Sequence, residues 1–284
     1  MTKSFKDFSL EGTDFSCFAD RPDLAIVNEH FGMTWNMGKY RERFIAERQP
    51  YRFVEGRIIL ILEGEAECEL SLDHYNIHKG NVLLLEPDTI VELKSCSDDY
   101  SGIGIICNDI DSISENIILS PDPKDWDEIM ALVDSLWDIA RRVPFRRETV
   151  RHLLSCIISD ILDIDRAKSE RRPVKKEKRR EQIFSRFKKL VNENCDRHRS
   201  IPFYADKLAL TPHYLSSLIS NVSGQSVMYW INRAAILQAK VLLKDKEMLV
   251  YEVAERLNFP SQSAFGLFFK RETGMTPGQY RNAN

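Results

Sequence analysis

Two short stretches near the C-terminus place small polar and basic side chains at helical spacing. In the first stretch, the positions on one face are His213, Ser216, Ser217 and Ser220. In the second stretch, they are Gln262, Ser263, Gly266, Leu267 and Lys270, of which Gly266 and Leu267 are not polar. Imidazole, amide and hydroxyl groups can donate to or accept from base edges in a DNA groove, and a lysine suits a phosphate. These residue types therefore favour recognition of a nucleic acid.

Both stretches belong to an internal repeat. The segments "YADKLALTPHYLSSLISNVSG" (204–224) and "VAERLNFPSQSAFGLFFKRETG" (253–274) superpose with one added residue in the turn. In each copy a short helix meets a turn, Thr211 or Ser261 caps a second helix, and a glycine ends it. Two short helices joined by a tight turn form a helix-turn-helix, whose second helix can lie in a major groove.

Apolar residues in the repeat are expected to anchor these helices. Phe265, Phe268 and Phe269 share one side of the second helix, at i, i+3 and i+4. Between the copies, residues 226–243 are predicted to form a helix that is apolar on nearly two sides, as suits a position between two modules. At 1.5 Å per residue this helix spans roughly 27 Å, close to the separation of about 34 Å between successive major grooves.

The charge of the chain is divided between two segments of opposite sign. Residues 1–170 carry 19 Lys and Arg against 33 Asp and Glu, a net charge of −14, whereas residues 171–284 carry 21 against 10, a net charge of +11. A basic C-terminal domain favours a nucleic-acid partner; the alternative is a surface that is basic by chance. The run "RRPVKKEKRR" (171–180) is predicted to be a basic linker rather than a specific binding motif.

The C-terminal residues resemble the AraC/XylS-type bacterial transcription regulators. The resemblance covers about residues 181–284, and its strongest part is the stretch 250–281. The matching positions there are Ala254, Asn258, Phe259, Ser263, Phe265, Phe269, Lys270, Gly274, Pro277, Tyr280 and Arg281. The resemblance implies DNA binding by two recognition helices with base-facing positions at His213, Ser216, Ser217, Gln262, Ser263 and Leu267.

One of these positions departs from the family pattern. The family commonly has Arg where this chain has Leu267, and a leucine cannot hydrogen-bond a guanine edge, although it can touch a thymine methyl. The second motif is therefore expected to contribute mainly phosphate contacts and shape, while the first supplies most of the specificity.

The N-terminal part is predicted to be a β-domain, so the fold class is α+β. Short strands are expected in 56–72, with a hairpin at Glu63-Gly64, in 80–95, with a turn at 86–88, and in 100–108. The family resemblance implies a cupin-like β-barrel over residues 1–119, used for sensing and dimerisation, with an unidentified small-molecule effector as its ligand.

Residues 120–170 are predicted to form a helical dimerisation segment. Two helices are expected, and the second carries a wide apolar stripe. The candidate interface residues are Leu153, Leu154, Ile157, Ile158 and Ile161. The stripe could instead be core packing within one chain, and the sequence leaves the two alternatives open.

The sequence gives little support for catalysis, a cofactor or a metal. His74 and His78 lie four residues apart, outside the His-x-His pattern of metal-binding cupins, and are expected to be loop residues rather than ligands. Six cysteines without C-x-x-C spacing indicate buried thiols in a reducing cytoplasm. No secretory signal and no apolar run long enough to span a membrane are expected.

The leading hypothesis is thus a cytoplasmic, nucleoid-associated regulator that binds double-stranded promoter DNA as a homodimer. Its further partners would be the effector and RNA polymerase. The rival from another class is a cupin-type enzyme with a fused DNA-binding tail, for which the sequence offers neither metal ligands nor an acid/base pair. A third hypothesis is a protein-binding partner of the transcription apparatus whose tail grips DNA only weakly.

Overall fold

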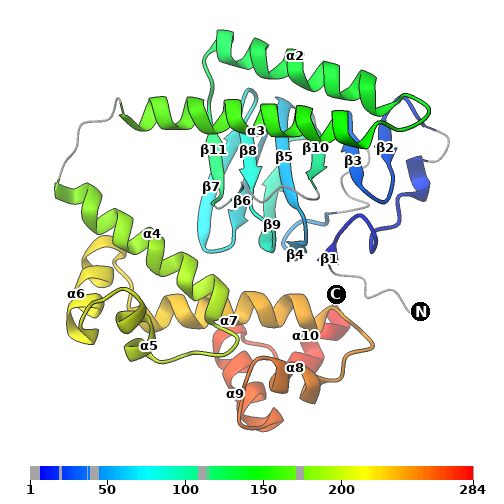
Figure 1. Cartoon of the computed structure of the whole chain (residues 1–284). Coiled ribbons are helices and arrows are strands. Elements are labelled where there is room, and N and C mark those ends of the chain that lie inside the picture. Colours follow the sequence, from blue (N-terminus) through cyan, green and yellow to red (C-terminus); the bar gives the residue numbers. More distant parts are fainter. Residues whose placement is uncertain are drawn as a thin grey trace. The chain divides into compact units, whose positions relative to one another are not determined.

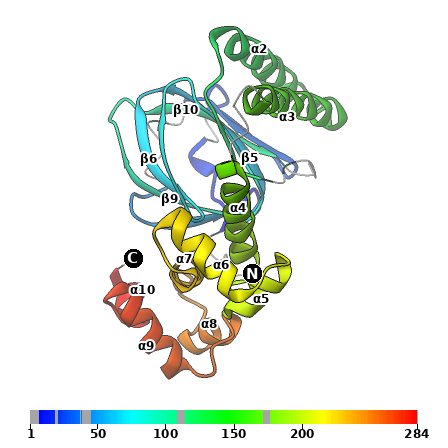
Figure 2. The ribbon, with the colours of Figure 1, turned by 90° about the vertical axis from the view of Figure 1, so that its left-hand side faces the viewer.

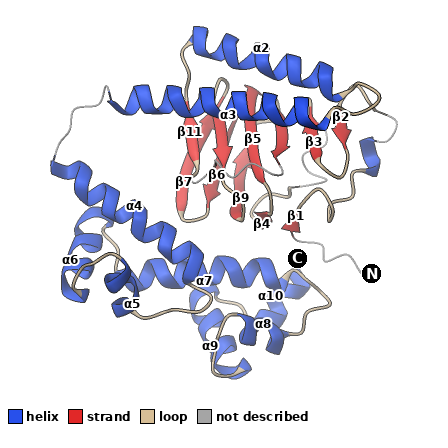
Figure 3. Cartoon of the chain, in the orientation of Figure 1, coloured by secondary structure: helices blue, strands red, loops and turns tan. Residues whose placement is uncertain are grey.

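The protein is described by a computed structural model of the 284-residue chain. The structure describes residues 7–18, 21–36, 38, 45–107, 113, 115–170 and 176–283. The chain divides into two compact units, and in the sequence the main boundary between them lies between Arg172 and Pro173. The first unit combines β-sheets with two long helices, whereas the chain beyond residue 173 is helical (Figure 1, Figure 3). The predicted α+β class is confirmed.

Two sheets form the first unit over its described residues. One has the order β1 (Asp7–Phe8), β4 (Pro50–Phe53), β9 (Thr89–Cys96), β6 (Glu65–Leu70), β7 (Asp73–His78). The other has the order β11 (Ile117–Leu119), β8 (Val82–Leu85), β5 (Gly56–Glu63), β10 (Ser101–Cys107), β3 (Phe31–Thr34), β2 (Ala25–Val27). A short 3₁₀ helix, η1 (Ser16–Phe18), precedes β2. In Figure 2, which is turned by 90° from the view of Figure 1, the strands of the two sheets curve around a common interior.

The hairpin predicted at Glu63-Gly64 is wrong. β5 and β6 belong to different sheets, so the chain turns a corner there instead of pairing with itself. The corner needs Gly64, whose φ is +75° and whose missing Cβ would lie 2.4 Å from the Oγ of Ser97. The turn at 86–88 likewise passes from β8 in one sheet to β9 in the other. The residue types at 63–64 and 86–88 correctly predicted tight turns, but not which strands pair on either side of them.

Burial of the six-stranded sheet on both faces explains its continuous apolar runs. In β5, Ile58 and Leu60 pack in one core cluster with the helices, while Ile61 packs in a second cluster with the opposite sheet. In β8, Val82 and Leu84 join the first cluster, and their neighbours join the second. Since successive side chains of a strand point to opposite faces, a strand covered on both sides is apolar at most positions.

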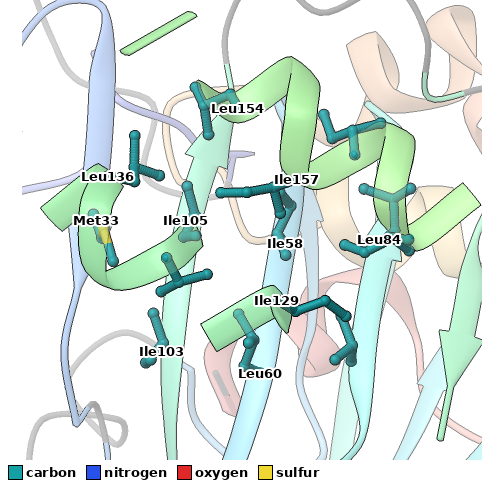
Figure 4. Packing of buried hydrophobic residues seen from close by; sticks show 14 of the residues in the cluster. Met33, Ile58, Leu60, Leu84, Ile103, Ile105, Ile129, Leu136, Leu154 and Ile157 are labelled. Carbon is teal, nitrogen blue, oxygen red and sulfur yellow. The ribbon is translucent and has the colours of Figure 1, made fainter. Parts of the chain in front are cut away.

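Helices α2 (Pro123–Ala140) and α3 (Arg147–Glu170) cover the outer face of this sheet. They run side by side along it (Figure 1, Figure 2). Asp122 caps α2, accepting a hydrogen bond from the N–H of Asp125 at 2.9 Å. Figure 4 shows Leu154 and Ile157 of α3 over the side chains of β5 and β10.

The interface assignment for the α3 stripe needs correction. Four of the five proposed interface residues lie in this intramolecular core and are at most 3% exposed: Leu154, Ile157, Ile158 and Ile161. The fifth, Leu153, is partly buried at the edge of the same cluster. These four are therefore core residues, because the stripe covers an apolar sheet face of its own chain. Dimerisation itself stays a prediction.

The second unit contains seven helices within the described residues. They are α4 (Lys176–Asn194), α5 (Ile201–Lys207), α6 (Pro212–Ser223), α7 (Val227–Leu243), α8 (Val250–Arg256), α9 (Gln262–Thr273) and α10 (Pro277–Ala283). The run 171–180 is not wholly a linker, because α4 begins at Lys176; residues 171–175 lie outside the described residues. The sequence did not suggest a role for α4, which buries Phe187 and Val191 in the unit. No helix among the described residues is long and apolar enough to cross a membrane.

Candidate nucleic-acid interface

The first helix-turn-helix is formed by α5 and α6. In the turn, Ala209 has a φ of +53°, and the N–H of Leu210 donates to the carbonyl of Ala205 at 2.9 Å. The Thr211 hydroxyl then caps α6 by accepting from the N–H of Tyr214 at 3.2 Å. Gly224 ends the helix with a φ of +70°. Short-range hydrogen bonds thus fix the angle at which α6 leaves the turn.

The second helix-turn-helix, α8 and α9, repeats this geometry. Asn258 has a φ of +52°, and the N–H of Phe259 donates to the carbonyl of Ala254 at 2.8 Å. Ser261 caps α9 by accepting from the N–H of Ala264 at 3.1 Å, and Gly274 ends it with a φ of +77°. The repeat predicted from the sequence is therefore a repeat of backbone conformation.

Both second helices are held by their apolar faces. In α6, Leu215, Leu218 and Ile219 are buried. In α9, Phe265 and Phe269 are buried and Phe268 is partly buried, so these phenylalanines anchor the helix as predicted. α7 contacts α4 and α6 near one end of the unit, and α8, α9 and α10 near the other. One central helix therefore connects the two modules.

The outward face of α6 carries the predicted polar residues. His213, Ser217 and Ser220 are exposed, while Ser216 is half-buried and its hydroxyl donates to the carbonyl of Pro212 at 2.8 Å. The Ser217 hydroxyl accepts from Asn221 at 3.4 Å, which leaves its own hydrogen available. Because the Ser216 hydrogen is already used, His213 and Ser217 are the better donors to a base edge.

The outward face of α9 is less polar. Gln262, Ser263 and Lys270 are exposed, and Leu267 at the centre of the face is 74% exposed. A Cβ added at Gly266 would meet nothing within 4 Å, so the surface beside Leu267 is open. This face can offer an amide, a hydroxyl, an apolar contact and one positive charge.

Comparison with known proteins agrees with this geometry. A model of the helix-turn-helix domain family matches residues 204–283. Regulatory protein SoxS of Salmonella typhimurium is 28% identical over 102 residues, which cover 36% of this chain and 95% of SoxS. The arabinose operon regulatory protein of the same organism is 35% identical over 87 residues, which cover 31% of each chain. The C-terminal region is an AraC-type helix-turn-helix domain.

Solved structures resemble the AraC-type domain or a longer part of the chain. The C-terminal domain of AraT, a response regulator from Geobacillus stearothermophilus, is 27% identical and covers 36% of this chain and 85% of its own, with a TM-score of 0.35. ToxT from Vibrio cholerae is 15% identical and covers 89% of this chain and 98% of its own, with a TM-score of 0.43. The present chain spans about a third of the arabinose operon regulatory protein.

The structure adds residues to the AraC-type domain that the sequence did not suggest. Tyr214 is 48% exposed on α6, beside His213, where a phenol can reach a phosphate or a base edge. Arg271 follows Lys270 on α9 and forms an ion pair of 2.6 Å with Glu272. The only signal for Tyr214 was an aromatic residue placed off the apolar stripe of its helix.

Burial shifts the pKa values of three polar groups in the AraC-type domain. Burial raises the pKa of the Cys195 thiol to about 12, so this cysteine is protonated and unreactive at neutral pH. Burial also raises the pKa of Tyr204, whose hydroxyl donates to the carbonyl of His198 at 2.6 Å. Burial lowers the pKa of the Arg199 guanidinium from its usual value.

The first unit contains an apolar cavity of about 110 Å³. Aromatic and aliphatic side chains from both sheets line it, among them Phe53, Leu83 and Val91. Of the described residues that line it, Arg57 alone is charged; it is 4% exposed, with its guanidinium 4.5 and 4.4 Å from the ring centres of Phe8 and Phe53. Arg57 also donates to the Phe8 carbonyl, and its Nη2 atom lies 3.5 Å from a carboxylate oxygen of Glu55. A cavity of this composition suits an apolar molecule with one acceptor group.

The histidines considered as metal ligands lie in a strand, not in a loop as predicted. His74 and His78 belong to β7. The Nε2 atom of His74 is 3.7 Å from a Glu67 carboxylate oxygen, and the Nδ1 atom of His78 is 3.0 Å from the Lys79 carbonyl oxygen. Among the described residues, no group of three or more His, Cys, Asp or Glu side chains is arranged to hold a metal ion.

Proposed function

We propose that the chain is a sequence-specific DNA-binding transcription regulator that reads two successive major grooves with α6 and α9. The observation that carries this proposal is the duplicated module, which presents an exposed polar helix face on either side of the central helix α7. The net charge of +11 over residues 171–284 supplies the attraction to phosphates. The names of the matched relatives, regulatory protein SoxS and arabinose operon regulatory protein, support the same function.

The two helices are proposed to contribute unequally. His213 and Ser217 on α6 can make directional hydrogen bonds to base edges, each worth about 1–3 kcal/mol of discrimination when well placed. On α9, Leu267 offers only an apolar contact where a long donor would otherwise reach, although Gln262 and Ser263 remain able to read a base. Lys270 is expected to bind a phosphate, which carries no sequence information.

Selection of binding sites from a pool of random duplexes tests this division. The full-length wild-type protein should select one preferred sequence. His213→Ala or Ser217→Ala should relax the preference at particular base pairs, whereas Leu267→Ala should relax it less. If the wild type selects no sequence, the proposed function is wrong; if only Leu267→Ala changes the preference, the helix assignment is wrong.

The salt dependence of binding separates phosphate contacts from base contacts. Lys270→Ala should weaken all duplexes alike and reduce the slope of log K against log salt by about one unit. Lys124→Ala, which removes an exposed lysine of α2 in the first unit, is the matched control and should leave the slope unchanged. Equal slopes for Lys270→Ala and the wild type would remove Lys270 from the interface.

We further propose that a small effector occupies the cavity of the first unit. The cavity is slightly smaller than the engineered cavity of about 150 Å³ that holds benzene in another protein. Its apolar lining would cover a short hydrocarbon or aromatic body. Arg57, which lies 3.5 Å from a Glu55 carboxylate oxygen, would share its guanidinium with a ligand carboxylate at one end. An apolar monocarboxylate is thus the ligand class that the lining favours.

Thermal unfolding with three probes of equal chain length tests the ligand class. Hexanoate should raise the unfolding temperature of the full chain more than hexanol, and hexylammonium should not raise it. A ligand present at about 100 times its Kd adds roughly 2.7 kcal/mol of stability. Arg57→Gln should remove the advantage of hexanoate over hexanol. Equal effects of the acid and the alcohol on the wild type would exclude recognition of the carboxylate by Arg57.

The regulator is proposed to act as a homodimer in the cytoplasm and to contact RNA polymerase when bound beside a promoter. Light scattering of the full chain across protein concentrations tests the dimer. A monomer at every concentration, with unchanged binding to the selected duplex, would contradict it.

A further inference from the structure

A second connection between the two helix-turn-helix modules lies outside α7. The segment that follows α4, residues 195–199, packs in the first module, since Cys195 and Tyr204 are both buried there. It reaches the turn between α8 and α9. The side-chain amide of Asn258 donates to the carbonyl of Arg197 at 3.0 Å, and the Arg199 guanidinium carbon lies 3.5 Å from the ring centre of Phe259. Both contacts are made to residues of the turn that immediately precedes α9.

Stacking on Phe259 is the main interaction of the Arg199 guanidinium. Its Nε atom donates to the Cys195 carbonyl only at 3.4 Å, and its Nη2 atom is buried with no hydrogen-bond partner among the described residues. A guanidinium is planar and weakly hydrated, so it stacks on a ring with a smaller desolvation cost than an ammonium. If Arg199 served only to add a positive charge to the surface, burying its guanidinium against Phe259 would bring no advantage.

The turn transmits this contact to α9. The Phe259 ring lies 5.2 Å from the ring of Phe265 and 5.0 Å from that of Phe268, measured between centres. These two phenylalanines anchor α9 to its module. A displacement of Phe259 therefore moves the recognition helix itself.

We propose that Arg199 is a positioning residue for DNA recognition, which, with Asn258 and Phe259, fixes α9 relative to α6. This proposal rests on the proposed function, because the contact would set the spacing of the two recognition helices, α6 and α9, on DNA. Without this contact, the main connection between the modules over the described residues is α7 and the packing around it. The second module then gains freedom to rotate, and binding across two grooves must restrict that freedom again.

The test uses the full chain and three variants that keep the net charge. Arg199→Lys retains the charge but not the planar stacking group. Phe259→Leu retains apolar bulk between the anchoring phenylalanines but not the ring face. Arg197→Lys is the matched control, because the Arg197 side chain is 80% exposed and only its backbone carbonyl takes part in the contact. Circular dichroism establishes that each variant is folded.

The probes are the duplex selected by the wild-type protein and two versions with one base pair inserted or deleted between its half-sites. The wild type should prefer the selected spacing. Arg199→Lys and Phe259→Leu should bind the selected spacing roughly three- to thirtyfold more weakly, with the preference over the altered spacings reduced and the salt slope unchanged. A duplex containing only the α6 half-site should be bound as by the wild type. Arg197→Lys should behave as the wild type on every probe.

Three results would overturn the inference. The first is a wild-type spacing preference in Arg199→Lys and Phe259→Leu. The second is an equal loss on the single half-site and on the full site, which indicates general destabilisation. The third is additivity: where both variants fold, effects of Arg199→Lys and Phe259→Leu on the unfolding free energy that simply add in the double variant would exclude the contact. Should one of the two variants fail to fold, the first two criteria are applied to the other variant alone. Failure of the wild type to select any duplex overturns the proposed function instead, and the inference with it.

Discussion

Replacing Ile157 by alanine tests whether the apolar stripe of α3 belongs to the core of one chain. Ile157 is 0% exposed and lies in one cluster with Ile58 and Leu60 of β5 (Figure 4). If it is a core residue, the substitution destabilises the first unit and leaves the association of chains unchanged. If it lies in a seam, the substitution weakens association first.

The size of the expected loss follows from the atoms removed. Ile→Ala deletes three buried carbons, and at about 0.8 kcal/mol each the transfer contribution is about 2.4 kcal/mol. Because a close-packed sheet and helix relax only partly around the gap, a cavity contribution is added, and the total should be about 3–4 kcal/mol. Cys156→Ala, on the exposed side of the same helix turn, should stay within about 0.5 kcal/mol of the wild type.

Urea unfolding followed by tryptophan fluorescence measures the loss of unfolding free energy in the first unit. Three of the four tryptophans, Trp35, Trp126 and Trp137, lie in the first unit, and Trp230 lies in the second. The transition of the first unit should move to lower urea in Ile157→Ala, while binding to the selected duplex by folded protein is retained. An unchanged unfolding midpoint together with a shift from dimer to monomer in light scattering would refute the core assignment.

Three further substitutions test local features of the fold. Ala209→Asn should raise the free energy of unfolding of the second unit by about 0.5–1 kcal/mol, because alanine is strained at a φ of +53° and asparagine tolerates the left-handed region; an unchanged denaturation midpoint would contradict this. Gly266→Ala should add about 0.5–1 kcal/mol, since the new methyl meets no atom within 4 Å inside a helix; a loss in urea unfolding would mean that the helix depends on that glycine. Burial, and then the carboxylates of Glu128 and Asp125, raise the pKa of Asp160 above 3.8, so its ionisation costs stability as the pH rises through the raised pKa. Asp160→Asn should thus unfold at higher urea than the wild type at pH 7 but not below about pH 4, and a constant difference across that range would exclude the carboxyl group as its cause.

The sequence by itself determined the recognition modules, because the interactions that form them are local. Thr211 and Ser261 each cap the helix that follows by accepting a hydrogen bond from the backbone N–H three residues later. The glycines that end α6 and α9 have a positive φ. The phenylalanine anchors of α9 follow from the 3.6-residue period alone. The outward positions of both helices could therefore be placed without a structure, whereas Tyr214 could not be distinguished from an anchor by its type.

The start of helix α4 was not predicted, because its local sequence pattern is ambiguous. Its first half is dense in charge, and only a narrow set of apolar positions, including Phe187 and Val191, identifies a buried side. A run of charges is typical of both a linker and a solvated helix face. The local pattern does not separate the two.

Tertiary structure alone decided which strands pair, what the α3 stripe covers and how the modules are held together. An apolar strand such as β5 has the same sequence whether it turns back in a hairpin or turns a corner into the opposite sheet. The α3 stripe is equally apolar against a second copy or against its own sheet, because either partner excludes water from the same side chains. The Arg199–Phe259 contact joins residues 60 positions apart through a cation and a ring face. No sequence period encodes such a contact, since its two residues belong to different modules.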